Sequence, residues 1–161
     1  MTCPSFYVSI QEHCTDTLAE FASRLQRCTK KSVGSVEIGE LCSITDCPNG
    51  VYVFYDDQDV PWYVGKASSR SFVERIPSHF DPRADGWFGT LPKRIMSICK
   101  TTDYCDAIQL GLSLRLVLIG VQTKDVATKV ENVLRTYLQP MLNATGNDPY
   151  PEHEMLTTFL N

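Results

Sequence analysis

Two tyrosines that stand close to a glycine and a lysine are the first residues of this chain that could do chemistry. Tyr52 lies in the stretch GVYVFY and Tyr63 in the stretch WYVGK, and the residues DDQD separate the two apolar runs. β-Branched and aromatic runs joined by such a loop predict a β-hairpin. A loop of even length pairs Tyr52 directly with Tyr63 on one face. There the two phenols stand beside Gly65, where a backbone can approach a ligand, and Lys66, which can meet an anion.

The opposite face of this hairpin is the predicted core side. It carries mostly β-branched and aromatic residues, namely Val51, Val53, Tyr55, Val60, Trp62 and Val64. The acidic residues between the two runs are interpreted as turn punctuation and not as metal ligands.

Basic side chains follow the hairpin. Ser71 and Glu74 fit a capping box, which predicts a helix that begins near residue 71 and that Pro77 bends or ends. On one helix, Arg75 and His79 share a face because they are four residues apart. Arg75 offers a planar, permanently charged group that matches phosphate.

One glutamate is placed so that it could look across the sheet. The stretch 123–140 has apolar residues at helical spacing and ends at Pro140. At ~100° per residue, Glu131 falls about 20° beyond Leu138, at the border of the apolar stripe. This position predicts a carboxylate at the edge of the core.

The remaining elements are predicted from shorter patterns. Residues 16–31 form an amphipathic helix with Asp16 as its N-cap, and residues 32–44 allow a short strand. Further along the chain the patterns predict a loop at 81–89, a short helix at 91–100, an ambiguous segment at 101–111, a third strand at 112–120 and a C-terminal tail that packs by its last residues.

Composition and charge bound the class of protein. The 161 residues, 43% of them apolar, suffice for a single domain over 1–161. We expect no signal peptide and no membrane span, and seven cysteines at irregular spacings favour reduced thiols in the cytoplasm. The net charge is -4, yet residues 61–135 hold 11 Lys and Arg against 7 Asp and Glu. That segment suits a local site for an anionic substrate.

Together these residues resemble the GIY-YIG nucleases. Gly50-Val51-Tyr52 is similar to the GIY element and Tyr63-Val64-Gly65-Lys66 to the YIG element, and the other matching positions are Arg75, His79, Glu131, Pro140 and Asn143. The resemblance covers residues 50–143. It leaves residues 1–49 as an N-terminal extension and 144–161 as a C-terminal tail.

The resemblance implies an α/β (α+β) fold with a small, mainly antiparallel three-stranded sheet flanked by helices. The amphipathic pattern at 16–31 adds a helical N-terminal extension. It also implies hydrolysis of DNA phosphodiesters with Mg²⁺ or Mn²⁺, for which Glu131 is the expected metal ligand. Arg75 would stabilise the transition state, and Tyr52 would align the attacking water with help from Tyr63 and His79.

Three further residues are expected to meet nucleic acid, namely Lys66, Arg70 and Asn143. Because the segment from Tyr63 to Arg75 is longer than in compact family members, Arg70 competes with Arg75 for the catalytic role. Asn143, after a proline that ends a helix, is interpreted as an amide that holds a loop.

Two alternatives to a DNA nuclease stay open. The first is a module that only binds nucleic acid or protein, and the second is a nuclease that acts on RNA.

Overall fold

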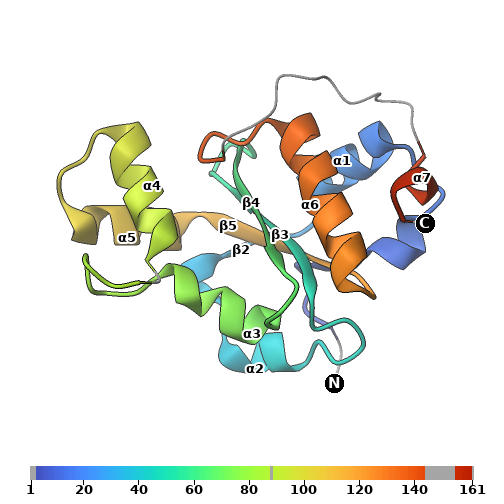
Figure 1. The fold of residues 1–161 in the computed structure, drawn as a ribbon, viewed down its shortest axis with the longest axis horizontal. Helices are drawn as coiled ribbons and strands as arrows, with labels where there is room; N and C mark the ends of the chain where they lie inside the picture. Colours follow the sequence, from blue (N-terminus) through green and yellow to red (C-terminus); the bar gives the residue numbers. More distant parts are fainter. Residues whose placement is uncertain (1–2, 88, 144–154, 161) are drawn as a thin grey trace.

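The computed structural model describes residues 3–87, 89–143 and 155–160 and arranges them in three layers, with a β-sheet between two groups of helices (Figure 1). The strands are β1 (Tyr7–Ser9), β2 (Lys31–Ser32), β3 (Gly50–Tyr55), β4 (Pro61–Ala67) and β5 (Arg115–Gly120). The α-helices are α1 (Leu18–Arg27), α2 (Ile38–Cys42), α3 (Phe72–Arg75), α4 (Thr90–Cys99), α5 (Tyr104–Ser113), α6 (Lys124–Leu138) and α7 (Thr157–Leu160). Short 3₁₀ helices are η1 (Ile10–His13), η2 (Val33–Ser35) and η3 (Pro77–His79). Among the described residues, no helix is long and apolar enough to cross a membrane.

The sheet confirms the α+β class but is larger than the three strands predicted. Within the described part of the chain it has five strands in the order β1-β5-β3-β4, and β2 also pairs with β5. β1 runs parallel to β5 and the other pairs are antiparallel. The N-terminal segment, expected to be helical, therefore contributes two strands as well as α1. They satisfy backbone groups along the free side of β5, where Leu118 N donates to Phe6 O at 2.8 Å.

Both faces of the sheet are buried, so the predicted division into a core face and a less apolar face is wrong. One face packs against α1 and α6 through residues such as Val53, Phe21 and Val130. The other packs against α3, α4 and α5, and it includes Tyr52 and Tyr63. Figure 1 shows these helices on opposite sides of the strands. Every residue of β3 is consequently buried.

The hairpin of β3 and β4 is present, but its register differs from the predicted one. Tyr52 pairs with Gly65, and Phe54 pairs with Tyr63. Tyr55 then pairs with Pro61, which leaves Trp62 as the extra residue of a bulge. The bulge turns the Trp62 side chain toward the face that holds Tyr63, and Val60, also expected in the core, is 48% exposed.

The turn between these strands explains the shift in register. Asp56 Oδ1 accepts hydrogen bonds at 2.9 Å from the backbone N–H groups of Gln58 and Val60, and Asp59 adopts a positive φ of 64°. This conformation closes the hairpin over a turn that is not the even loop expected from DDQD.

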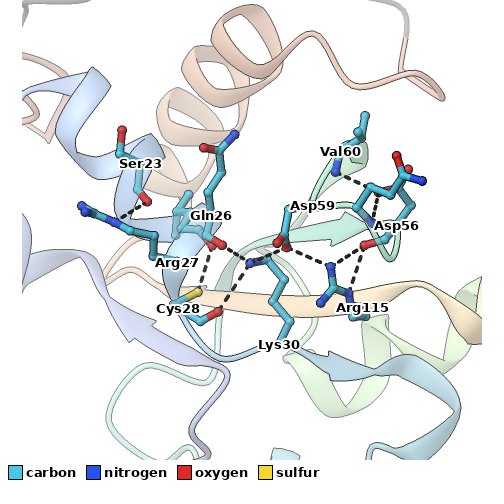
Figure 2. A network of polar contacts seen from close by, with 11 residues as sticks. Ser23, Gln26, Arg27, Cys28, Lys30, Asp56, Asp59, Val60 and Arg115 are labelled. Carbon is cyan, nitrogen blue, oxygen red and sulfur yellow. Dashed lines mark hydrogen bonds and ion pairs between the residues drawn. The ribbon is translucent and has the colours of Figure 1, made fainter.

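A network of polar contacts ties the same turn to the rest of the fold (Figure 2). Asp59 Oδ1 lies 2.8 Å from Lys30 Nζ and 2.9 Å from Arg115 Nη2. Arg115 also donates to the backbone oxygen of Asp56 from Nε at 3.0 Å and from Nη2 at 2.7 Å. The acidic turn thus joins the segment after α1 to the start of β5, and its aspartates act as structural residues.

The other elements confirm part of the sequence predictions. α1 is present, but Thr17 and not Asp16 is its N-cap, in a capping box with Glu20. Residues 32–44 form η2 and α2 and not mainly a strand. The capping box of Ser71 and Glu74, the break at Pro77 and the helix over 91–100 are confirmed, and the ambiguous segment forms α5. Of the tail, Leu156 is buried against the α1 and α6 side, and residues 144–154 and 161 lie outside the described residues.

Candidate functional site

A pocket of about 250 Å³ collects most of the predicted site residues. It is bordered by β4, by the connection from β4 to α3, by α3 and by α6. Its lining side chains are mostly polar or charged, namely Tyr63, Lys66, Ala67, Ser68, Ser69, Arg70, Arg75 and Glu131. Three cations and one carboxylate face this pocket, so an anion is the ligand that its charge favours.

Arg75 is the last residue of α3, a short helix whose N-terminus is fixed by a capping box. Ser71 and Glu74 cap each other's backbone N–H groups at the start of the helix. Arg75 Nη1 donates to Ser78 Oγ at 3.3 Å, and the same hydroxyl donates to the carbonyl oxygen of Arg75 at 2.7 Å. Arg70 and Arg75, the two candidates for the catalytic arginine, both line the pocket.

Glu131 faces the pocket from α6, as its place at the border of the apolar stripe predicts. Its side chain is 14% exposed, and Oε2 lies 3.4 Å from Lys66 Nζ. Lys66 Nζ also donates to Thr128 Oγ1 at 3.1 Å. The two residues expected to meet metal and nucleic acid are therefore paired with each other.

Tyr52 lies behind the pocket, fully buried, and its hydroxyl contacts His79. The distance from Tyr52 OH to His79 Nε2 is 2.6 Å, and His79 is fully buried too. His79 Nδ1 lies 3.3 Å from Thr90 Oγ1 at the start of α4. Tyr63, by contrast, lines the pocket, and its ring centroid is 6.2 Å from that of Tyr52. The two tyrosines share a face, but they are diagonal neighbours and not a direct pair.

Burial keeps both members of the Tyr52–His79 pair neutral. Desolvation raises the pKa of Tyr52 well above its ordinary value; Tyr63 and Glu131 act in the same direction, and Arg75 opposes them. Desolvation lowers the pKa of His79 to about 3, and the charges of Arg75 and Arg94 add to this effect. We assign the hydrogen bond as Tyr52 O–H donating to Nε2, which leaves the ring proton on Nδ1 facing Thr90.

Both glycines of the matching motifs are required by close contacts. A Cβ at Gly65 would lie 2.5 Å from Cζ and from the hydroxyl oxygen of Tyr52. A Cβ at Gly50 would lie 1.9 Å from the backbone oxygen of Ile119 on β5. Gly65, expected to admit a ligand, instead makes room for the Tyr52 phenol.

Asn143 holds the segment after α6 against the outer edge of β4. Its Oδ1 accepts a hydrogen bond from Val64 N at 2.8 Å, and its Nδ2 donates to Val64 O at 2.9 Å. Leu142 N donates to Trp62 O at 2.8 Å, and Arg94 Nη1 donates to Leu142 O at 2.9 Å. This arrangement agrees with the interpretation of Asn143 as an amide that holds a loop.

Several residues of the site were not found from the sequence. Ser68 and Ser69 line the pocket, Thr128 holds Lys66, and Thr90 contacts His79. Thr128 is three residues before Glu131 on α6, so helical spacing could have indicated it. The serines and Thr90 carry no comparable signal, because their positions depend on how loops meet helices.

Glu131 suits a hard divalent cation, but it would be a single protein ligand. Among the described residues, no group of three or more His, Cys, Asp or Glu side chains is placed to hold a metal ion. A lone carboxylate leaves the other positions of Mg²⁺ to water and to substrate oxygens, which that ion accepts. Lys66 would have to leave the Glu131 oxygen for the cation to bind there.

Comparison of the chain with protein-family models, with curated proteins and with solved structures gave no match.

Proposed function

We propose that this chain is a divalent-metal-dependent DNA endonuclease of the GIY-YIG type. The observation that carries the proposal is the pocket in which Tyr63, Lys66, Arg70, Arg75 and Glu131 meet. These residues come from β4, the connection after it, α3 and α6. The motif resemblance selected Tyr63, Lys66, Arg75 and Glu131, and Arg70 entered as the alternative to Arg75. A phosphodiester suits the pocket because its cations can bind the phosphate oxygens and its carboxylate can hold a cation.

Each side chain has a role that follows from its place. Arg75 directs its guanidinium to the phosphate oxygens, where negative charge grows in the transition state. Glu131 would be the protein ligand of a divalent metal ion, whose charge would supply polarisation of the leaving oxygen and neutralisation of the phosphate. Tyr63 lines the pocket and is therefore better placed than Tyr52 to contact the attacking water. Tyr52 and His79 are positioning residues in this scheme, because both are fully buried and neither lines the pocket.

Two observations favour the alternative of a module that binds nucleic acid without cleaving it. The Tyr52 hydroxyl is buried on His79, and Glu131 is paired with Lys66. In that alternative the pocket still binds phosphate but performs no hydrolysis. This alternative would be supported if the protein bound nucleic acid but did not cleave it with either Mg²⁺ or Mn²⁺.

The test is cleavage of plasmid DNA, single-stranded DNA and RNA by one preparation with Mg²⁺ or Mn²⁺. We expect Arg75→Gln and Glu131→Gln each to lower the cleavage rate by about 10²–10³-fold. Matched controls are Arg83→Gln, whose arginine is paired with Asp81 away from the pocket, and Asp125→Asn on the exposed start of α6. Both controls should cleave like the wild type. Wild-type cleavage rates in both pocket variants would refute the mechanism. Faster cleavage of RNA than of DNA would identify RNA as the substrate.

A further inference from the structure

The ion pair of Lys66 and Glu131 lies at the point where the proposed function places a metal ion. Glu131 is only 14% exposed, and a carboxylate so placed needs a partner. Lys66 Nζ provides that partner at 3.4 Å, while its own side chain is 35% exposed at the mouth of the pocket. The carboxylate is thus already neutralised in the free protein.

A metal ion and the lysine compete for this one carboxylate. Two cations within about 4 Å of each other repel by several kcal/mol at the effective dielectric constant of a protein surface. Mg²⁺ also gives up its water ligands reluctantly, and a single paired carboxylate does little to replace them. Metal binding to the free protein should therefore be weak.

We propose that Lys66 is the resident counter-ion of Glu131 and that substrate phosphate draws it away, so that the carboxylate takes a divalent cation only after a phosphodiester has entered. This inference rests on the proposed function and gives the order of binding at the same pocket. With the ion pair intact, Arg75 gives the pocket lining a positive charge, which attracts phosphate before metal.

Thr128 is the positioning residue of this arrangement. Its Oγ1 accepts the hydrogen bond from Lys66 Nζ at 3.1 Å and donates to the carbonyl oxygen of Lys124 at 3.1 Å. The hydroxyl thereby fixes the end of a long, flexible side chain beside Glu131. Lys66 already lines the pocket, so a phosphate that enters there lies within reach of its flexible side chain.

The experiment measures binding of Mn²⁺ alone to the full chain by electron paramagnetic resonance. We expect Lys66→Met to raise the affinity for Mn²⁺ by about tenfold or more, since a positive charge beside the carboxylate is removed. Lys66→Arg keeps that charge and should bind as weakly as the wild type. Thr128→Val should raise the affinity by about two- to threefold, the value of part of one hydrogen bond. The double variant Lys66→Met with Glu131→Gln should lose the whole gain.

Dimethyl phosphate then serves as a phosphodiester that is not turned over. It should raise the affinity of the wild type for Mn²⁺ and have a clearly smaller effect on Lys66→Met. An unchanged affinity in Lys66→Met, a gain that survives Glu131→Gln, or an equal effect of dimethyl phosphate on both proteins would overturn the proposal. No step requires cleavage, so a protein that exchanges Lys66 for metal but cuts no DNA would refute the nuclease assignment and leave this inference standing.

Discussion

The hydroxyl of Tyr52 lies 2.6 Å from Nε2 of His79, and neither side chain is exposed to solvent. The hydrogen bond joins β3 to the 3₁₀ helix that follows α3, across the face of the sheet that borders the pocket. Because both groups are buried, the pair is stable only while both are neutral. Its contribution should therefore depend on pH in a predictable direction.

Acid should destabilise the protein through His79. Its pKa is lowered to about 3 in the folded state from an ordinary 6.5, so the unfolded chain binds a proton that the folded chain refuses as pH falls below 6.5. The contribution is fully present above that value and is lost progressively toward pH 3. Between pH 7 and pH 5 this linkage amounts to about 2 kcal/mol of unfolding free energy. Urea denaturation at both pH values checks it, and in His79→Gln the drop should be smaller by that amount. An equal drop in both proteins would show that His79 is accessible to protons.

The two tyrosines should separate stability from activity. Tyr52→Phe leaves His79 Nε2 buried without its partner, and we expect a loss of about 1–2 kcal/mol in urea denaturation. Tyr63→Phe removes a hydroxyl from the pocket lining, so stability should stay within about 0.5 kcal/mol of the wild type. Its cleavage rate should fall by about 10²-fold if Tyr63 contacts the attacking water. If Tyr52→Phe lowered the cleavage rate and Tyr63→Phe did not, Tyr52 and not Tyr63 would be the residue that contacts the attacking water.

Gly65→Ala should disturb the site through Tyr52. The new Cβ would meet the phenol at 2.5 Å, and because the ring is fully buried it can shift only by repacking its neighbours. Such overpacking costs about 1–3 kcal/mol. Gly39→Ala in α2 is the matched control, since nothing lies within 4 Å of its added Cβ. That control should be neutral or slightly stabilising. If the two variants had the same denaturation midpoint, the tight contact between residue 65 and the Tyr52 phenol would be contradicted.

The site was more predictable from the sequence than the fold that carries it. Arg75 and Glu131 were placed by a capping box and by helical periodicity, both of which depend only on nearby residues, and they do line one pocket. The hairpin register could not be predicted in this way. It depends on the bulge at Trp62 and on contacts from Lys30 and Arg115, which are distant in sequence.

The N-terminal strands were missed for a related reason. β1 and β2 are three and two residues long, too short for an alternating pattern to be recognised. They exist because β5 offers backbone groups for them to pair with, which is a property of the assembled sheet and not of residues 7–9 or 31–32.

The turn of the hairpin should depend on the charge of Asp59. Its carboxylate, 44% exposed, pairs with Lys30, whose side chain is only 3% exposed, and also with Arg115. Asp59→Asn keeps a residue that tolerates the positive φ of 64° but removes the charge. We expect a loss of about 1–2 kcal/mol in urea denaturation at pH 7, a range that allows for the exposure of the carboxylate. Because Lys30 and Arg115 lower the pKa of Asp59, the difference from the wild type should persist down to the ordinary pKa of an aspartate and vanish at lower pH. Asp57→Asn, on the exposed part of the same turn, should change stability little. If the two variants lost equal stability, general charge on the turn and not the contact with Lys30 would be responsible.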